Sequence, residues 1–168
     1  PSMKFKLRTL PLWSSATKIL ISFIEPVNAN IIFVSSDGND ESGNGSMEEP
    51  FLTIQKGIDV SNTADTVMVL NGIYTGGLNI TNKQISLIGE SMSDTKMNVP
   101  ITDPNISIID TMDTGDTIRI ENFKIKRGNS PLGGGLYING SIVAAKNLDL
   151  SNNNSSTDGG AINLNDAS

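Results

Sequence analysis

Three aspartates recur at three-residue spacing, Asp110, Asp113 and Asp116, and form an acidic cluster. Several carboxylates held together are the ligands that Ca²⁺ prefers. With a nearby base to abstract the proton next to a uronate carboxylate, such a cluster would suit the cleavage of an acidic polysaccharide by elimination. The bases that we consider for this role are Lys83, Lys124, Lys126 and Arg127. Asp beside Thr and Gly is also the composition of a solvated turn, which is the interpretation that we adopt.

A second polar stretch, residues 35–49, contains Asp37, Asn39, Asp40 and Glu41. Its oxygen-rich side chains raise the alternative of a bound Ca²⁺, but their spacing lacks the EF-hand register. A stretch so dense in Asp, Asn, Ser and Gly predicts turns that are held by side-chain-to-backbone hydrogen bonds. We therefore name no catalytic, cofactor-binding or metal-binding residue in this segment or elsewhere in the chain, with calcium as the open alternative.

The aromatic residues Tyr74, Tyr137 and Trp13 have rings that can stack on sugars. The two tyrosines are scattered, so we expect them to pack at the edges of the fold instead. Trp13 belongs to an N-terminal segment of different character.

The composition excludes several classes of site. The chain has no cysteine and no histidine, which removes disulfides, thiolate zinc sites, cysteine nucleophiles and every site that needs an imidazole. The formal net charge is −6, and the longest basic cluster is Lys124, Lys126 and Arg127. Binding to nucleic acid needs clustered Lys and Arg, so we predict no nucleic-acid partner.

The N-terminal segment has the order of a secretory signal peptide. Basic residues within 4–8 precede an apolar run at 19–24, and the small residue Ala29 follows. The apolar run is too short to span a bilayer. We predict that residues 1–29 are a signal peptide, with a disordered tail as the alternative. Residues 30–168 are then predicted to form the N-terminal part of a single domain outside the cell or at its surface.

The rest of the chain predicts one helix and many short strands. Residues 31–34 predict a strand, and Pro50 opens a helix predicted over 51–60 on the spacing of its apolar residues. Strands of three to five residues then follow, most of them separated by Gly, Asn or Asp. They are expected at 66–70, 78–80, 85–88, 106–109, 117–120, 123–125, 136–138, 148–150 and 162–164.

An internal repeat decides the fold class. Residues 123–130 align with residues 148–155, and each is followed by a glycine-led strand, at 133–138 and 159–164. The repeat length is 25 or 26 residues, about one coil of a solenoid. One coil cannot bury its own apolar face, so coils must stack. The sequence thus predicts an all-β parallel β-helix, with columns of Ile, Leu and Val inside and ladders of Asn at corners.

Two regions resemble known families. Residues 33–40 (Phe-Val-Ser-Ser-Asp-Gly-Asn-Asp), 49–58 (Glu-Pro-Phe-Leu-Thr-Ile-Gln-Lys-Gly-Ile) and 64–74 (Ala-Asp-Thr-Val-Met-Val-Leu-Asn-Gly-Ile-Tyr) resemble the opening of pectin-lyase-like proteins. Residues 152–162 are similar to the polymorphic outer membrane protein repeat with its Gly-Gly-Ala-Ile element, although Leu150 stands where that repeat has Phe. The resemblance implies a right-handed β-helix whose N-terminal end is capped by the helix 51–60.

The function predicted from these features is non-catalytic. We expect a secreted or cell-surface module, adhesin-like or structural, whose partners are extracellular polysaccharides or cell-surface glycans, with no cofactor. No C-terminal cap is visible, so further β-helix coils are expected C-terminally. The alternative is the N-terminal part of a polysaccharide lyase or glycoside hydrolase whose active site lies in later coils.

Overall fold

The computed structural model describes residues 28–98, 106–109, 117–157 and 159–165. Its elements are β1 (Ile31–Val34), α1 (Ile54–Val60), β2 (Thr66–Val69), β3 (Gly72–Tyr74), β4 (Leu78–Thr81), β5 (Ser86–Gly89), β6 (Thr95–Asn98), β7 (Ile106–Ile109), β8 (Thr117–Lys126), β9 (Leu136–Asn139), β10 (Ile142–Ser151) and β11 (Ile162–Asn165).

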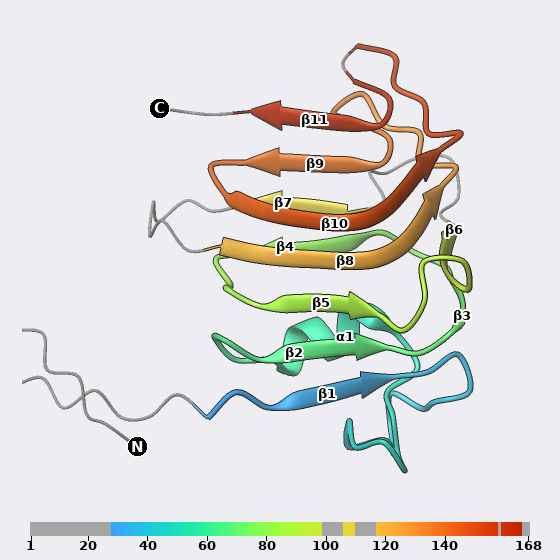
Figure 1. The fold of residues 1–168 in the computed structure, drawn as a ribbon, viewed down its shortest axis with the longest axis vertical. Helices are drawn as coiled ribbons and strands as arrows, with labels where there is room; N and C mark the ends of the chain where they lie inside the picture. The colour runs from blue at the N-terminus through green and yellow to red at the C-terminus, as the bar shows by residue number, and fades with distance from the viewer. Residues whose placement is uncertain (1–27, 99–105, 110–116, 158, 166–168) are drawn as a thin grey trace, which may run out of the picture.

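The strands form a right-handed parallel β-helix. One sheet has the order β1-β2-β5-β8-β6-β3 with β10 beside β8, and the other has the order β11-β9-β7-β4. Every pair within them is parallel. The chain runs to the right along the front, returns to the left behind, and reaches the front again one level higher (Figure 1). The predicted fold class is confirmed.

Each coil contributes to three faces. The first face is made by β1, β2, β5 and the first halves of β8 and β10. The second face is made by β3, β6 and the second halves of β8 and β10. The third is made by β4, β7, β9 and β11.

The separate strands predicted at 117–120 and 123–125 are wrong, because β8 is one strand of ten residues and β10 has the same length. Asn122 and Asn147 lie at the corner with φ of 63° and 52°. One residue in this left-handed conformation bends the strand while pairing continues on both sides.

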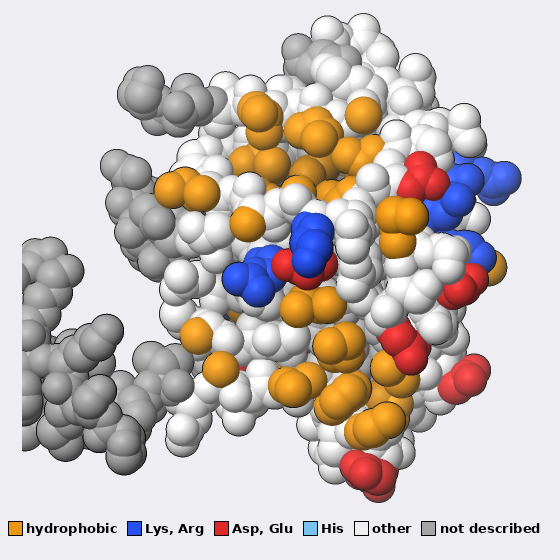
Figure 2. Space-filling view, viewed as in Figure 1, with side chains coloured by type: hydrophobic (Ala, Val, Ile, Leu, Met, Phe, Trp, Pro, Cys, Tyr) orange, Lys and Arg blue, Asp and Glu red, His pale blue; other side chains and the backbone are white. Residues whose placement is uncertain are grey.

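The core consists of apolar columns, as predicted. Residues that face inward on neighbouring coils pair in register, so that like side chains stack along the β-helix axis. The columns are Tyr74–Met97–Ile125–Leu150, Leu78–Ile106–Leu136–Ile162 and Ile80–Ile108–Ile138–Leu164. Their lower members are buried, whereas Ile162 and Leu164 are 43% and 71% exposed. Figure 2 shows hydrophobic side chains gathered between β10 and β11, at this open edge.

The coils differ in length although their strands stay in register. Thr66 pairs with Ser86, a step of 20 residues, and Ser86 pairs with Arg119, a step of 33 residues. The predicted repeat of 25 or 26 residues holds from β8 to β10 and from β9 to β11. Segments between the faces absorb the differences, so the repeat is visible in the sequence only for the last coils.

The glycine-led segments before β9 and β11 stack on each other. Gly135 N–H donates to the carbonyl of Gly160 at 3.1 Å, and Leu136 N–H donates to that of Ala161 at 2.9 Å. A Cβ added to Gly135 would lie 2.4 Å from the Ala161 carbonyl oxygen. The glycines that mark the repeat are thus required where the backbones of two coils approach closely.

Helix α1 lies against β1, β2 and β4 at the N-terminal end of the β-helix, as a cap. It begins later than predicted, at Ile54, because Phe51 is extended and bridges Val34. The Thr53 side chain caps the helix by accepting from Lys56 N–H at 3.2 Å. At the other end, Lys83 Nζ donates to the carbonyls of Ile58, Asp59 and Ser61.

Candidate functional site

The acidic cluster Asp110, Asp113 and Asp116 lies outside the described residues, as does Trp13. Of the four bases named with the cluster, Lys83 lies apart from the other three. Lys83 is held at the end of α1, whereas Lys124 and Lys126 lie on β8, on the second face of the β-helix. Arg127 follows β8 with a positive φ of 65°.

The loop over 35–49 folds as the predicted side-chain-supported turns. Asn39 Oδ1 accepts from Glu41 N–H at 2.8 Å and from Ser42 N–H at 3.0 Å. Asp40 reaches across to the start of α1, where its oxygens accept from Leu52 N–H, Thr53 N–H and Thr53 Oγ1 at 2.7–3.0 Å. The Asp40 carboxylate therefore ties the loop to the helix.

The two tyrosines do not offer their rings to a ligand. Tyr74 is 6% exposed and belongs to a core column, and its hydroxyl donates to the Leu70 carbonyl at 2.8 Å. Burial raises the pKa of Tyr74 to about 12. Tyr137 is also buried. Neither ring is placed to stack on a sugar.

The outer side of the second face carries a ladder of side chains in register. Ile73 on β3 pairs with Lys96 on β6, Lys96 pairs with Lys124 on β8, and Lys124 pairs with Asp149 on β10. We call these four residues the outer ladder. Neighbouring strands are about 4.8 Å apart, so the outer ladder repeats a side chain at that spacing.

A parallel row lies beside the outer ladder, made by Asn98, Lys126 and Ser151. Lysine, arginine and acidic side chains gather on the right-hand side of the molecule, beside the ends of β8 and β10 (Figure 2).

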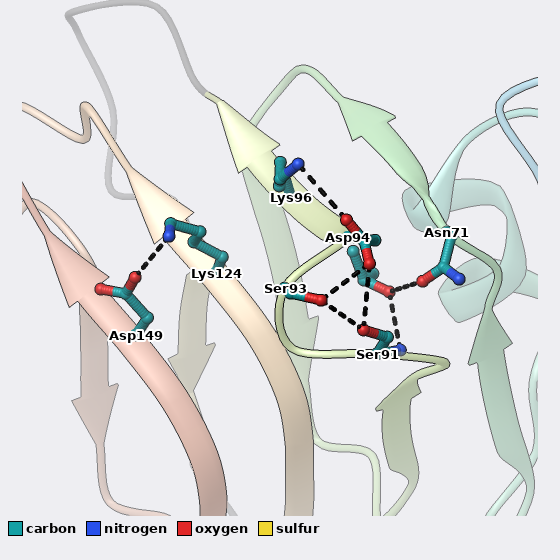
Figure 3. Close-up of polar contacts among 8 residues, drawn as sticks. Asn71, Ser91, Ser93, Asp94, Lys96, Lys124 and Asp149 are labelled. Carbon is teal, nitrogen blue, oxygen red and sulfur yellow. Dashed lines mark hydrogen bonds and ion pairs between the residues drawn. The ribbon is translucent and has the colours of Figure 1, made fainter.

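Ion pairs and hydroxyl groups organise the outer ladder (Figure 3). Lys124 Nζ lies 2.9 Å from Asp149 Oδ2. This contact raises the pKa of Lys124 and lowers that of Asp149. Lys96 Nζ lies 3.7 Å from Asp94, which also accepts from Ser93 Oγ at 2.7 Å. The hydrogen bond from Ser93 is the main cause that lowers the pKa of Asp94.

The turn before β6 extends this polar network. Ser91 Oγ lies 2.9 Å from Ser93 Oγ, and Thr95 Oγ1 donates to Asn71 Oδ1 at 3.3 Å. The backbone N–H of Asn71 donates to Glu90 at 2.9 Å. The second face therefore presents ammonium, hydroxyl, amide and carboxylate groups on a rigid sheet, an arrangement suited to hydrogen bonding with sugar hydroxyls.

Sequence reasoning named Lys124 and Lys126 but missed Lys96, Asp94 and Asp149. The segment Thr95–Asn98 has little apolar character, so β6 was not predicted as a strand. The outer ladder depends on the register between coils of unequal length, and only the 25-residue spacing of Lys124 and Asp149 is visible in the sequence.

Comparisons of the chain with protein-family models, with curated proteins and with solved structures find no match. Within the described ranges, no three or more Asp or Glu side chains group in a way that could hold a metal ion. No helix in this described part of the chain has the length and apolar character needed to cross a membrane.

Proposed function

We propose that this chain is a non-catalytic β-helix module of an exported protein. It serves at the cell surface as an adhesin-like or structural element and contacts extracellular polysaccharide through its second face. The observation that carries the proposal is the outer ladder, which places Lys96 and Lys124 on neighbouring strands of a rigid sheet.

The scaffold fits an extended ligand. The outer-ladder strands are anchored from within by buried Tyr74, Met97 and Ile125, so their outward side chains project from a fixed backbone. A chain of sugars laid across the strands would meet a polar side chain at each of β6, β8 and β10, about 4.8 Å apart, and the apolar Ile73 at β3. Pre-organised donors bind with a smaller entropic cost than mobile ones.

Two sequence features support a role outside the cell. The order of basic, apolar and small residues in 1–29 is that of a signal peptide. The residues quoted above resemble pectin-lyase-like proteins and polymorphic outer membrane protein repeats, and such a resemblance favours a role outside the cell. It does not assign a ligand, because one fold hosts many functions.

Affinity electrophoresis in gels that contain acidic or neutral polysaccharides tests the binding. The double substitution Lys96→Ala and Lys124→Ala removes two charged donors. It is expected to raise the dissociation constant for the polysaccharide in the gel about tenfold, which is seen as weaker retardation. Arg119→Ala is the matched control, because Arg119 faces outward from β8 on the first face. Unchanged retardation of the double variant would contradict the proposed binding face.

A catalytic role would appear in a separate assay. The chain is incubated with polygalacturonate and Ca²⁺, and unsaturated product is followed by its absorbance. We expect none. Product that is lost on substituting Asp110, Asp113 and Asp116 by Ala would replace the proposal by the polysaccharide-lyase alternative.

A further inference from the structure

Asp65 is a buried carboxylate whose role is not explained by the second face. It lies just before β2, is 1% exposed, and accepts two backbone hydrogen bonds. Its Oδ1 accepts from Asn30 N–H at 2.8 Å, and its Oδ2 accepts from Asn62 N–H at 2.7 Å. In the described part of the chain the acidic partners of ion pairs are Asp94, Glu121 and Asp149, and Asp65 is not among them. A buried carboxylate is costly unless a positive charge or several donors compensate it.

The residue that meets Asp65 Oδ1 is fixed at the start of the fold. The carbonyl of Asn30 accepts from Thr66 N–H at 2.8 Å, so both backbone groups of Asn30 are held by residues 65 and 66. Asn28, Ala29 and Asn30 are exposed and precede β1 without regular structure. The Ala29–Asn30 peptide bond is therefore accessible, and it is also the bond that follows the small residue of the signal-like segment.

We propose that the chain is cleaved between Ala29 and Asn30, and that the new α-ammonium group of Asn30 forms an ion pair with Asp65. The inference rests on the proposed export of the chain. A peptidase hydrolyses the bond: water supplies the hydroxyl that leaves Ala29 with a carboxylate and the proton that leaves Asn30 with an amino group, which is protonated near neutral pH.

The cleavage changes the chemistry of an existing contact, because the nitrogen of Asn30 already lies 2.8 Å from Asp65 Oδ1. An amide donor becomes a charged donor at the same place. Charge-assisted hydrogen bonds are about twice as strong as neutral ones, and more so away from water. The ion pair would fasten β1 to β2 at the end of the β-helix that α1 covers. Processing would thus stabilise the mature protein.

A cycle of two changes tests the ion pair without export. Residues 26–29 of the full chain are replaced by the recognition sequence of a specific protease that leaves Asn30 as the first residue, and the protein is cut after it has folded. Cutting is expected to raise the midpoint of thermal unfolding by about 3 °C or more. In an Asp65→Asn background the same cut should produce no rise. Equal shifts in both backgrounds would overturn the ion pair.

A second measurement covers the case in which Asp65→Asn does not fold. The new amino group of the cut protein is acetylated, which removes its charge and leaves Asp65 intact. The gain in midpoint temperature should then disappear, and its persistence would overturn the proposal.

In a secreting host, N-terminal sequencing of the exported protein is expected to begin at Asn30. Another first residue would also overturn it, whereas polysaccharide binding by the same sample reports separately on the proposed function.

Discussion

Asn122 shows how a single residue shapes this molecule. It bends β8 at the corner between the first and second faces, with φ of 63°. Its Nδ2 donates to the Gly89 carbonyl on the coil below at 3.1 Å, and its Oδ1 accepts from Asn147 Nδ2 on the coil above at 3.0 Å. Asn154 and Asn129 form a similar contact at 3.1 Å. The Asn ladders predicted from composition are present, and Asn serves because it tolerates positive φ and can hydrogen-bond along the axis.

Substitutions at this corner separate the two contributions. Asn122→Ala is expected to lower the free energy of unfolding by about 2 kcal/mol, through the strain of positive φ and the lost hydrogen bonds. Asn122→Gly keeps the conformation and should cost about 1 kcal/mol. Urea titration followed by circular dichroism measures both. Equal losses for Ala and Gly would mean that the conformation contributes nothing.

Asp40 gives the stability an acid dependence. Partial burial of this carboxylate raises its pKa, but hydrogen bonds from Thr53 and Leu52 and the charge of Lys56 outweigh burial, so the pKa lies below its ordinary value of 3.8. A lowered pKa in the folded state stabilises the fold at pH values above the ordinary pKa, and this contribution is lost as the pH falls through the folded-state pKa.

Asp40→Asn should therefore reduce stability near neutral pH and reduce its decline as the pH falls from about 5 to about 2, the range in which such a carboxylate becomes protonated. Thermal unfolding measured across that range compares the variant with the unchanged protein. Parallel curves for the two proteins would contradict the role given to this carboxylate.

At the scale of elements, the strands whose apolar side chains form the core are the ones that the sequence predicts best. Most of the short strands were predicted from the apolar residues that form the inward columns, because alternating apolar residues have the period of a strand. The strands β3 and β6 were missed, since Gly72–Tyr74 is very short and Thr95–Asn98 is mostly polar. Their pairing with neighbouring coils holds them, and no local pattern records that pairing. The outer ladder escaped prediction for the same reason.

Helix α1 contains a glycine that packing requires. A Cβ on Gly57 would lie 2.8 Å from a Val34 methyl and 3.0 Å from a Val67 methyl, and both valines are fully buried. Alanine is the better helix former by about 1 kcal/mol. Overpacking of a rigid core costs about 1–3 kcal/mol, which outweighs that gain.

Gly57→Ala is therefore expected to lower the free energy of unfolding by about 1 kcal/mol. Asp59→Ala, at an exposed position of the same helix, should change it by less than about 0.5 kcal/mol. Chemical denaturation of the two variants checks the contrast. Stabilisation by Gly57→Ala would show that α1 can move away from β1 and β2.

At the scale of the whole molecule, the two ends of the described β-helix differ. The N-terminal end is covered by α1, whereas β10 and β11 offer strand edges next to exposed Ile162 and Leu164. Unpaired edges with apolar neighbours favour association.

We expect the chain to associate with rising concentration, and we expect Leu164→Lys to reduce this association. Leu132→Lys, at another exposed leucine, is the control, and light scattering measures the mass. A monomer at all concentrations would contradict the expectation.

The unequal coil lengths have a mechanical consequence. When the ends of the chain are pulled apart, the coils of a solenoid can detach one at a time, because each contacts only its neighbours. The outermost described coil repeats after 25 or 26 residues, and its release would lengthen the tether by about 80–95 Å. The step of 33 residues between β5 and β8 would release a longer segment, about 110–120 Å. Force–extension traces would therefore show steps of unequal length, each set by the number of residues in the coil that is released.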